Sequence, residues 1–416
     1  MKSKRVPSLI QWWFGPGLSV EYIFISKDRR PQNTYKLIRL YFRTWLIHPI
    51  KRRIAKLYVL LLQKLFGLTV IAITGSAGKT STKDMIASIL NQKNRTVFSH
   101  ANITPTFNIP TTILQCTRKT KYLVLEMGVE YPGDMDFYLW LVKPNVGIIT
   151  NIYQTHTEYF KDVEGVSREK TKLVKALDSN DFVILNKENE HLKSIASKLK
   201  SQLVWFGERG EVSASDEKVS SDGTSFTLQI GHTKEEIHLS FIGKQFVSNS
   251  LAAVAGAYAI GATVQEIKGG LEKLKPAEHR MNLLYLKSGA VILDDTYNSN
   301  PSAAKKALET LREISGKKQT VAVLGDMLEL GENEKEIHKE LGKYCSSLGI
   351  NYVLGVGNLA QNVVGEFYKK SEVSKYWVPK AENSYDLLKP FLKKDVVVLI
   401  KGSRSIGLDK LVAKLA

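Results

Sequence analysis

Beyond residue 69, the chain alternates short apolar runs rich in β-branched residues with longer stretches in which apolar residues recur every three to four positions. The short runs predict strands and the longer stretches predict helices. Regular alternation of the two is typical of a mostly parallel, doubly wound α/β sheet. The predicted strands are Thr69–Ile73, Tyr122–Glu126, Val146–Thr150, Phe182–Asn186, Val291–Asp294, Thr320–Leu324, Tyr352–Val356 and Val396–Lys401.

One segment departs from this alternation. Between Leu203 and Leu239 we expect an antiparallel insertion in the sheet. The sequence contains no internal repeat and no low-complexity linker. At about 150 residues per domain, a chain of this length predicts two or three domains.

The first 68 residues have a helical pattern of their own. From Tyr35 to Phe66, apolar residues recur every three to four positions with lysines and arginines between them. This spacing predicts amphipathic helices. Pro49 divides the run into two helices and suits the start of the second.

Neither apolar stretch near the N-terminus predicts a secretory signal or a membrane span. The first, Leu9 to Val20, is short and is broken at residues 15–17, with no convincing cleavage site. The second, Leu57 to Thr74, is interrupted by Gln63 and Lys64 and continues into a predicted strand.

Charge is distributed unevenly along the chain. The 416 residues carry a net charge of +18, and residues 1–69 hold 14 Lys and Arg against two acids, Glu21 and Asp28. Residues 70–416 hold 45 basic against 39 acidic residues. An anionic partner of the N-terminus is therefore expected, whether lipid, nucleic acid or phosphorylated substrate. No nucleic-acid recognition motif is present, so we expect no nucleic-acid partner.

Two interpretations of the basic amphipathic helices remain open. Their apolar faces can pack on the next domain, as those of most amphipathic helices do. Alternatively, the helices can lie on an anionic membrane surface, which would make the protein peripheral to the inner face of the membrane.

Composition places the chain among globular proteins. Apolar residues make up 43% and charged residues 24% of the sequence. The two cysteines, Cys116 and Cys345, exclude a disulfide framework and a four-thiolate zinc site. Sparse thiols fit a reducing compartment, so we expect a cytoplasmic protein.

The clearest motif is VIAITGSAGKTSTKDMIASIL at residues 70–90. An apolar strand ends at Thr74, a turn rich in small residues follows, and a helix opens at Lys79. Converging backbone N–H groups and the helix N-terminus bind phosphates, while a lysine and a hydroxyl reach the terminal phosphates and Mg²⁺. The predicted ATP-binding residues are Gly75, Ser76, Ala77, Gly78, Lys79, Thr80 and Ser81, with Thr80 also a metal ligand.

This loop departs from the general triphosphatase pattern, because Ile73 stands where that pattern has its first glycine. TGSAGKTS resembles instead the ATP-binding loop of the Mur ligases, the ATP-dependent amide-forming enzymes of peptidoglycan assembly. The resemblance extends over about residues 69–416. It rests also on residues 125–152, QTHTEYF (154–160), SREKTKLVKAL (167–177), 241–261, HRM (279–281), DDTYNSNPSA (294–303), LGDMLELGE (324–332) and LIKGSRS (399–405).

The resemblance implies a catalytic centre with two Mg²⁺ ions. Glu126, at the end of an apolar run, would hold the ion that bridges ATP and acceptor. His156 would bind a second ion. Lys170 would react with CO₂ to give a carbamate, which converts a cation into an anionic ligand. Lys172 is the alternative, and an exposed basic helix face is the structural explanation of both lysines.

Further residues are carried over from the resemblance as nucleotide contacts. Asn186 and Asn249 would contact the adenine end of ATP, although Gln245 stands where the family commonly has histidine. Each asparagine could instead be structural, in a turn for Asn186 and as a helix cap for Asn249. Arg280 would offset charge in catalysis and contact ATP.

Residues of the C-terminal third would bind substrate. Asp295 would contact the nucleotide, and Tyr297, Asn298 and Asn300 would come from the same polar run. The remaining contacts to the amino-acid substrate or the transferred phosphoryl group would be Lys401, Ser403 and Arg404. Asn300 could also cap a helix that starts at Pro301, and Arg404 could form a surface ion pair.

We therefore predict an α/β fold with three parts. Residues 1–68 form a basic amphipathic helical segment, residues 69–277 a central ATP-binding domain with a P-loop core, and residues 278–416 a C-terminal Rossmann-like domain. The quoted motifs most resemble those family members that add D-alanyl-D-alanine to a UDP-linked muramoyl tripeptide through an acyl phosphate. We expect such a ligase to act as a monomer.

The resemblance ends at the N-terminus. Members of this specificity begin with a globular domain that grips the uridine diphosphate of the acceptor, whereas residues 1–69 here show no such character. The acceptor could therefore be the same UDP-linked peptide or another carboxylate, lipid-linked or polymeric. A third hypothesis is a membrane-surface protein that keeps an ATP switch without ligase activity.

Overall fold

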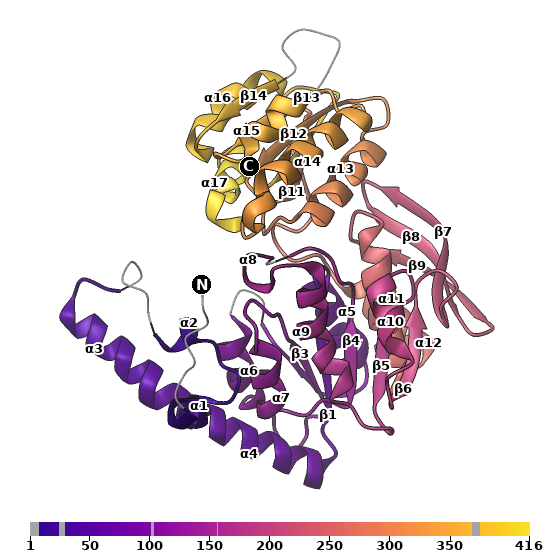
Figure 1. Ribbon diagram of the computed structural model, residues 1–416. Helices are drawn as coiled ribbons and strands as arrows, with labels where there is room; N and C mark the ends of the chain where they lie inside the picture. The colour runs from indigo at the N-terminus through magenta and orange to yellow at the C-terminus, as the bar shows by residue number, and fades with distance from the viewer. Residues whose placement is uncertain (1–7, 25–29, 101–103, 156, 368–374) are drawn as a thin grey trace.

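The computed structural model describes residues 8–24, 30–100, 104–155, 157–367 and 375–416 (Figure 1). In this part of the chain the strands form two sheets, one with nine strands and one with six. The first has the order β2-β3-β1-β4-β5-β6-β7-β8-β9, and the second has the order β10-β11-β15-β12-β13-β14. The N-terminal helices lie on the opposite side of the larger sheet unit from β7, β8 and β9.

The larger sheet is parallel from β2 to β6 and antiparallel from β7 to β9. Its strands are β1 (Thr69–Thr74), β2 (Thr96–Phe98), β3 (Tyr122–Glu126), β4 (Val146–Ile149), β5 (Phe182–Asn186), β6 (Gln202–Phe206), β7 (Val212–Ser220), β8 (Gly223–Ile230) and β9 (Thr233–Leu239).

The smaller sheet is parallel except for its first strand, which pairs antiparallel with β11. Its strands are β10 (Asn282–Tyr285), β11 (Val291–Asp295), β12 (Gln319–Gly325), β13 (Tyr352–Val356), β14 (Lys375–Val378) and β15 (Val396–Lys401).

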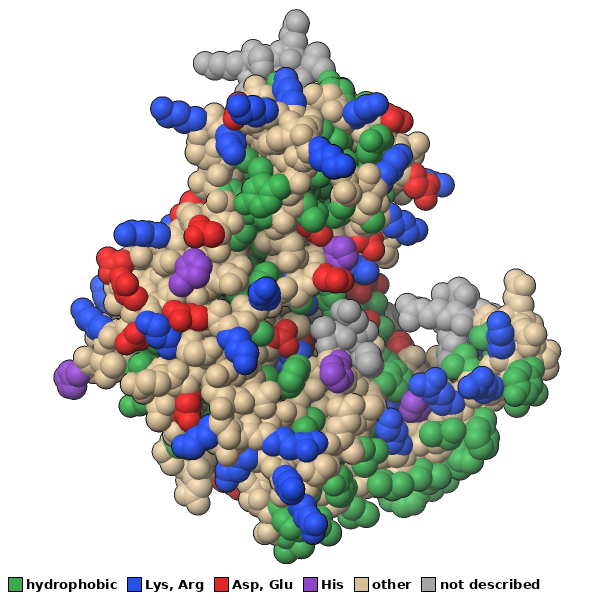
Figure 2. All heavy atoms as spheres, turned by 180° about the vertical axis from the view of Figure 1, so that it is seen from behind, with side chains coloured by type: hydrophobic (Ala, Val, Ile, Leu, Met, Phe, Trp, Pro, Cys, Tyr) green, Lys and Arg blue, Asp and Glu red, His purple; other side chains and the backbone are tan. Residues whose placement is uncertain are grey.

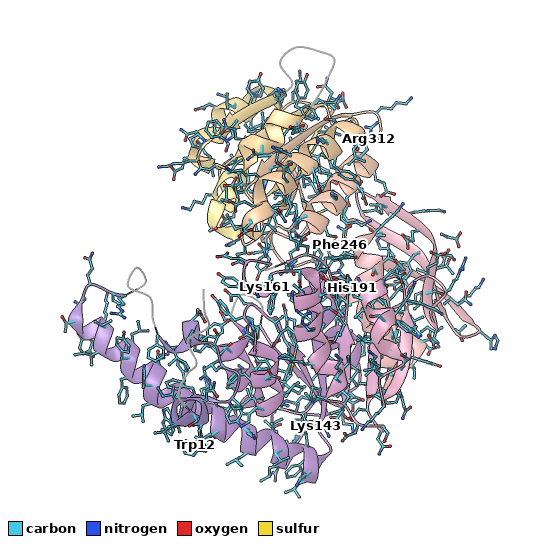
Figure 3. All side chains as sticks on the ribbon, viewed as in Figure 1. Trp12, Lys143, Lys161, His191, Phe246 and Arg312 are labelled. Carbon is cyan, nitrogen blue, oxygen red and sulfur yellow. The ribbon has the colours of Figure 1, made fainter. Side chains whose placement is uncertain are left out.

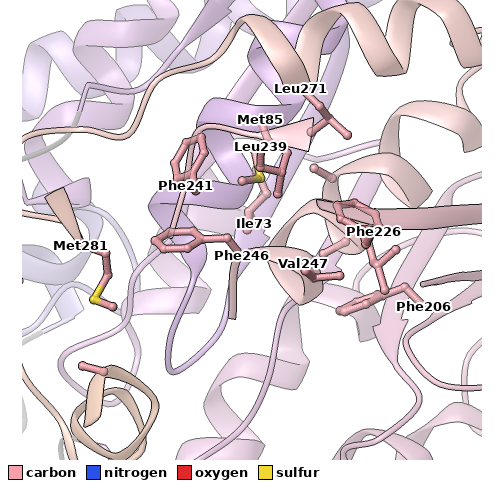
Figure 4. Packing of buried hydrophobic residues seen from close by; sticks show 14 of the residues in the cluster. Ile73, Met85, Phe206, Phe226, Leu239, Phe241, Phe246, Val247, Leu271 and Met281 are labelled. Carbon is pink, nitrogen blue, oxygen red and sulfur yellow. The ribbon is translucent and has the colours of Figure 1, made fainter. Parts of the chain in front are cut away.

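The central parallel strands are buried on both faces, so their alternate residues enter two different hydrophobic cores. In β1, Ile71 and Ile73 join the core under α5, α11 and α12, whereas Val70 and Ala72 face α4, α6, α7 and α9. Figure 4 shows part of the first core, including Ile73. These helices are α4 (His48–Phe66), α5 (Lys79–Leu90), α6 (Pro105–Ile113), α7 (Asp134–Leu141), α9 (Val163–Lys175), α11 (Gln245–Ala259) and α12 (Val264–Lys273).

Helices cover the smaller sheet in the same way. One face packs against α13, α14 and α15, and the other against α16 and α17. These helices are α13 (Pro301–Ser315), α14 (Glu334–Ser347), α15 (Ala360–Glu366), α16 (Ser384–Leu388) and α17 (Leu408–Leu415). The short α8 (Thr157–Phe160) and α10 (Glu190–Ala196) complete the larger unit.

The N-terminal segment is helical, as predicted. Its elements are α1 (Ser8–Phe14), α2 (Val20–Ile23), α3 (Thr34–Phe42), the π-helical turn η2 (Arg43–Ile47) and α4. The backbone stays right-handed helical through η2, so the two predicted helices form one rod, with Pro49 in the first turn of the second. Among the described residues, no helix has the length and apolar character needed to cross a bilayer.

The eight predicted strands are confirmed, with ends that agree within one residue. The prediction of an antiparallel insertion over Leu203–Leu239 was wrong at the start of that segment. Residues 202–206 form β6, which pairs parallel with β5, and antiparallel pairing begins only at Val212. The turn at Gly207–Gly210 between these strands separates the two modes of pairing.

Candidate active site

The loop between β1 and α5 requires glycine at two positions. Gly75 has φ +150° and Gly78 has φ +80°, a region that L side chains disfavour. A Cβ atom at Gly75 would lie 1.9 Å from Thr150 Oγ1, and one at Gly78 would lie 2.1 Å from Asn249 Oδ1. The backbone can therefore curl tightly after Thr74 only because these positions carry no side chain.

The end of the neighbouring strand β4 holds this loop in place. Asn151 accepts the Ala77 N–H at 2.8 Å through Oδ1 and donates through Nδ2 to the Ala77 carbonyl at 3.1 Å. Thr150 Oγ1 donates to the same carbonyl at 2.6 Å, and the Ser76 hydroxyl donates to the Tyr153 carbonyl at 3.0 Å. This role of Thr150 and Asn151 was not predicted, although their position after a buried strand is visible in the sequence.

Thr80 and Glu126 form the candidate magnesium site. Strand pairing aligns Glu126 with Ile73, so β3 ends beside the phosphate loop. The Thr80 hydroxyl donates to Glu126 Oε2 at 2.9 Å. No cluster of three or more His, Cys, Asp or Glu side chains suited to a metal occurs among the described residues. Two hard oxygens of this kind suit Mg²⁺, which takes most other ligands from water and substrate phosphates.

A buried lysine fixes the backbone beside Glu126. Lys83, on α5, is 1% exposed and donates from Nζ to the Ser99 carbonyl at 2.6 Å. The Ser99 hydroxyl oxygen in turn accepts the Glu126 N–H at 2.9 Å. This anchoring was missed because a lysine in a helix pattern gives no signal that it is buried.

Lys79 and Lys170 converge on one backbone oxygen. The Gly75 carbonyl accepts from Lys79 Nζ at 2.9 Å and from Lys170 Nζ at 3.1 Å. Burial first, and then the charge of Lys79, holds the pKa of Lys170 well below its usual range. Burial also lowers the pKa of Lys79, and Arg280 lowers it further, although Glu126 acts in the opposite direction. Two adjacent ammonium groups are disfavoured here, so the Lys170 amine binds a proton less readily than an exposed lysine does.

Lys172 points away from this centre. Its Nζ contacts Asp136 at 2.6 Å and Glu169 at 2.7 Å. Partial burial would lower the pKa of Lys172, but hydrogen bonds to these two carboxylates raise it. The two lysines predicted as alternatives thus occupy opposite environments, with Lys170 1% exposed on the buried face of α9.

The two predicted adenine contacts, Asn186 and Asn249, are both buried beside the loop. Asn186 ends β5, donates to the Thr150 carbonyl at 3.2 Å and accepts the Glu188 N–H at 2.8 Å, which makes it a turn residue as well. Asn249 lies inside α11, so the helix-cap explanation of this residue was wrong. Gln245 is the first residue of the same helix.

Arg280 links the two sheet units. Its Nη2 donates to Thr80 Oγ1 at 3.2 Å, and its guanidinium carbon lies 3.9 Å from the centre of the Tyr297 ring. The flanking residues His279 and Met281 have φ of +63° and +57°. Left-handed backbone at a non-glycine residue costs conformational free energy, and residues in this conformation cluster at functional sites.

The C-terminal unit adds a buried ion pair and a capped helix. The register of β11 and β15 places Asp295 beside Lys401, whose Nζ contacts the Asp295 carboxylate at 2.6 Å and the Asn298 carbonyl at 2.9 Å. Asn300 caps α13, and Pro301 occupies its first turn, which confirms the predicted helix start.

These groups line one cleft of about 580 Å³ where the two units meet. Figure 3 places Phe246, which also lines the cleft, at this junction. The predicted residues on the walls are Ser76, Ala77, Gly78, Lys79, Thr80, Ser81, Glu126, Asn186, Asn249, Arg280, Asp295, Tyr297, Asn298, Asn300 and Lys401. Lys244 and Lys306, which were not predicted as site residues, add positive charge to the walls.

Two family models match this chain, the Mur ligase middle domain over residues 73–257 and the Mur ligase, glutamate ligase domain over residues 279–404. A curated relative, the UDP-N-acetylmuramoyl-tripeptide--D-alanyl-D-alanine ligase of Buchnera aphidicola, is 34% identical over 352 residues, covering 83% of this chain and 76% of the relative. The chain belongs to the Mur ligase family.

Solved Mur ligases share the fold. The MurF structure from Acinetobacter baumannii superposes with a TM-score of 0.81 at 27% identity, covering 88% of this chain and 80% of that one. The MurF ligase from Thermotoga maritima, in complex with ADP, gives a TM-score of 0.79 at 25% identity and covers 88% and 83% of the two chains. The predicted α/β architecture is thereby confirmed.

Five of the residues expected from Mur ligases are not among those that line the cleft. Gly75 and Lys170 are two of them, and they are joined to each other by the hydrogen bond from Lys170 Nζ to the Gly75 carbonyl. His156 lies outside the described residues. The Ser403 hydroxyl accepts the Leu328 N–H at 3.1 Å and so supports a neighbouring loop. Arg404 is half exposed and pairs with Asp409 at 3.2 Å, as the surface-pair alternative anticipated.

Proposed function

We propose that this Mur ligase joins D-alanyl-D-alanine to a UDP-N-acetylmuramoyl tripeptide, using ATP. The names of its relatives describe this reaction, and the geometry supports the chemistry. The observation that carries the proposal is the contact between Arg280 of the C-terminal unit and Thr80 of the phosphate loop, at 3.2 Å. It brings a cation from the second unit to Thr80, which we propose to lie at the terminal phosphates of ATP.

The chain's own groups offset the repulsion between two anions. The loop N–H groups and Lys79 bind the phosphates of ATP, while Arg280 neutralises charge from the opposite wall. Thr80 and Glu126 would hold one Mg²⁺, which would supply further neutralisation of the transferred phosphoryl group. The acceptor carboxylate can then attack the γ-phosphorus, ADP leaves, and an acyl phosphate forms.

The second half of the reaction needs a positioned amine. The amino group of the dipeptide attacks the acyl carbon, loses a proton, and phosphate departs as the amide forms. Lys401 and Asn298, at the carboxyl ends of the second sheet, face the same cleft and are proposed to orient the dipeptide. Closure between the two units would exclude water from the acyl phosphate.

We further propose that Lys170 carries a carbamate. A neutral amine attacks CO₂ and releases one proton, and the lowered pKa of buried Lys170 favours that neutral form. The product would place an anion beside the Lys79 cation. Together with His156 it would hold a second Mg²⁺.

The proposal includes a division into residues 1–68, 69–277 and 278–416. We also propose that the protein is a monomer, that it works in the cytoplasm and that it has no nucleic-acid partner. Cys116 and Cys345 are free and buried, which suits a reducing compartment.

Phosphate release tests the proposal. The full chain is assayed with ATP and Mg²⁺ plus the muramoyl tripeptide, the dipeptide, both or neither, and rapid turnover is expected only with both substrates. Glu126→Gln should lower that turnover on the order of 10²-fold, whereas Glu382→Gln, on the surface of the C-terminal unit, should not. Dipeptide-dependent turnover with a different carboxylate, and none with the tripeptide, would replace the proposed acceptor.

A further inference from the structure

We propose that the rod formed by α3, η2 and α4 binds in the plane of an anionic membrane surface through its exposed apolar face. This interaction is independent of the ligase reaction. It concerns a surface on the far side of α4 from the protein core.

The helix α4 has two apolar faces. One face, with Ala55, Val59 and Leu62, is at most 2% exposed and packs on α6 and α7. The opposite face carries apolar residues at intervals of three or four, which is the repeat of one helix face. These are Ile50 (42% exposed), Ile54 (54%), Leu57 (67%), Leu61 (48%) and Leu65 (68%).

The exposed face continues along the rod beyond the body of the protein. No residue of α3 is buried, and Tyr35, Ile38 and Phe42 are 73%, 63% and 55% exposed. Figure 2 shows hydrophobic side chains gathered along this rod with lysines and arginines beside them. An apolar band of this length is unusual on a surface exposed only to water.

Charge identifies the partner. The sequence has no acidic residue between Asp28 and Asp84, whereas α3, η2 and α4 carry eight lysines and arginines, of which Arg52 alone is buried. Within the described part of the chain, none of these eight forms an ion pair with an Asp or Glu side chain. An apolar face flanked by cations alone complements acyl chains beneath anionic headgroups.

A second copy of the chain fits this surface less well. Pairing the rod with itself would bring two sets of uncompensated cations together, which is repulsive. A transmembrane insertion is also disfavoured, because no described helix is suited to cross a bilayer and the opposite face of α4 is occupied by the core.

Vesicle flotation tests the inference. The full chain is mixed with phosphatidylcholine vesicles, with or without one third phosphatidylglycerol. We expect binding to the anionic vesicles that weakens with added salt. The combined change Ile54→Glu, Leu57→Glu and Leu61→Glu should weaken it at least about tenfold. The matched control, Tyr258→Glu with Tyr285→Glu, alters exposed apolar residues elsewhere and should bind as the parent does.

The outcome does not depend on the folding of the triple variant. A second variant, with Lys36, Arg39 and Lys64 changed to Gln, leaves the apolar face intact and should also bind anionic vesicles more weakly. The inference is overturned if the parent protein does not float with anionic vesicles. It is also overturned if light scattering shows the parent protein as a dimer and the triple variant as a monomer. Ligase turnover in vesicle-free buffer should survive both sets of changes, which separates this test from that of the proposed reaction.

Discussion

At the scale of single residues, the site is governed by where positive charge is buried. Lys79 and Lys170 share the Gly75 carbonyl, and burial together with the charge of Lys79 lowers the pKa of Lys170. Lys172, only two residues along, is held charged by two carboxylates. The resemblance favoured Lys170 and left Lys172 as the alternative, and burial now separates the two lysines.

The proposed carbamate makes a spectroscopic prediction. With ¹³C-bicarbonate present, the protein should show a carbamate carbon signal that disappears in Lys170→Ala and persists in Lys172→Met. Turnover should fall on the order of 10²-fold or more in the first variant and stay close to the parent's in the second. A signal that survives loss of Lys170 would contradict the assignment.

The phosphate loop predicts a contrast between two glycines. Gly78→Ala forces a methyl group against Asn249, whereas a methyl group at Gly261, where φ is +89°, would have nothing within 4 Å. Gly261→Ala should cost only about 1 kcal/mol of unfolding free energy. Gly78→Ala should weaken ATP binding at least about tenfold, measured by calorimetry, while Gly261→Ala should leave ATP affinity unchanged.

At the scale of elements, the site assembles because parallel strands end at one edge of each sheet. This edge was predictable: the strand ends at Thr74, Glu126 and Asn186 could be located from apolar runs. The roles of Lys83 and Ser99 could not, because they depend on which helix face is buried and on a loop conformation that no periodicity encodes. The extent of β6 was mistaken for a similar reason, since parallel and antiparallel strands have similar local patterns.

The start of α7 predicts a pH effect on stability. Asp134 Oδ2 accepts the N–H groups of Glu130 and Tyr131, while Oδ1 is buried without a partner. Burial raises the pKa of Asp134 from 3.8 to about 7. The folded state therefore binds a proton that the unfolded state releases, so this group stabilises the fold at low pH and the contribution is lost as pH rises towards 7.

The substitution Asp134→Asn removes the titratable carboxyl group and with it this pH dependence. From pH 5 to pH 7, the parent's unfolding free energy should fall relative to that of the variant by up to about 1.4 kcal/mol per pH unit, and the difference should level off above pH 7. Denaturant titrations at several pH values measure it. A difference that is constant with pH would contradict the raised pKa.

At the scale of the whole molecule, two sheet units meet at a cleft and a basic rod extends from the larger unit (Figure 1). Arg280 spans the cleft, held by unusual backbone at His279 and Met281. The sequence resemblance supplied the identity of Arg280, but its stacking on Tyr297 and its contact with Thr80 depend on how the two units face each other. No local pattern determines that arrangement.

Removal of the Arg280 side chain should affect catalysis more than stability. Arg280→Ala should lower kcat/KM by about 10²-fold with little change in the midpoint of thermal unfolding. Arg404→Ala removes an exposed pair with Asp409 and should leave both quantities close to the parent's. Equal kinetic losses in the two variants would contradict the placement of Arg280 at the phosphoryl group.

Isotope transfer tests the central claim most directly. The muramoyl tripeptide is labelled with ¹⁸O in its terminal carboxylate and incubated with ATP, Mg²⁺, D-alanyl-D-alanine and the full chain. Activation by phosphorylation predicts that each phosphate released carries one ¹⁸O from the acceptor, together with a new amide product. Release of unlabelled phosphate alongside the same product would contradict an acyl phosphate and the mechanism built on it.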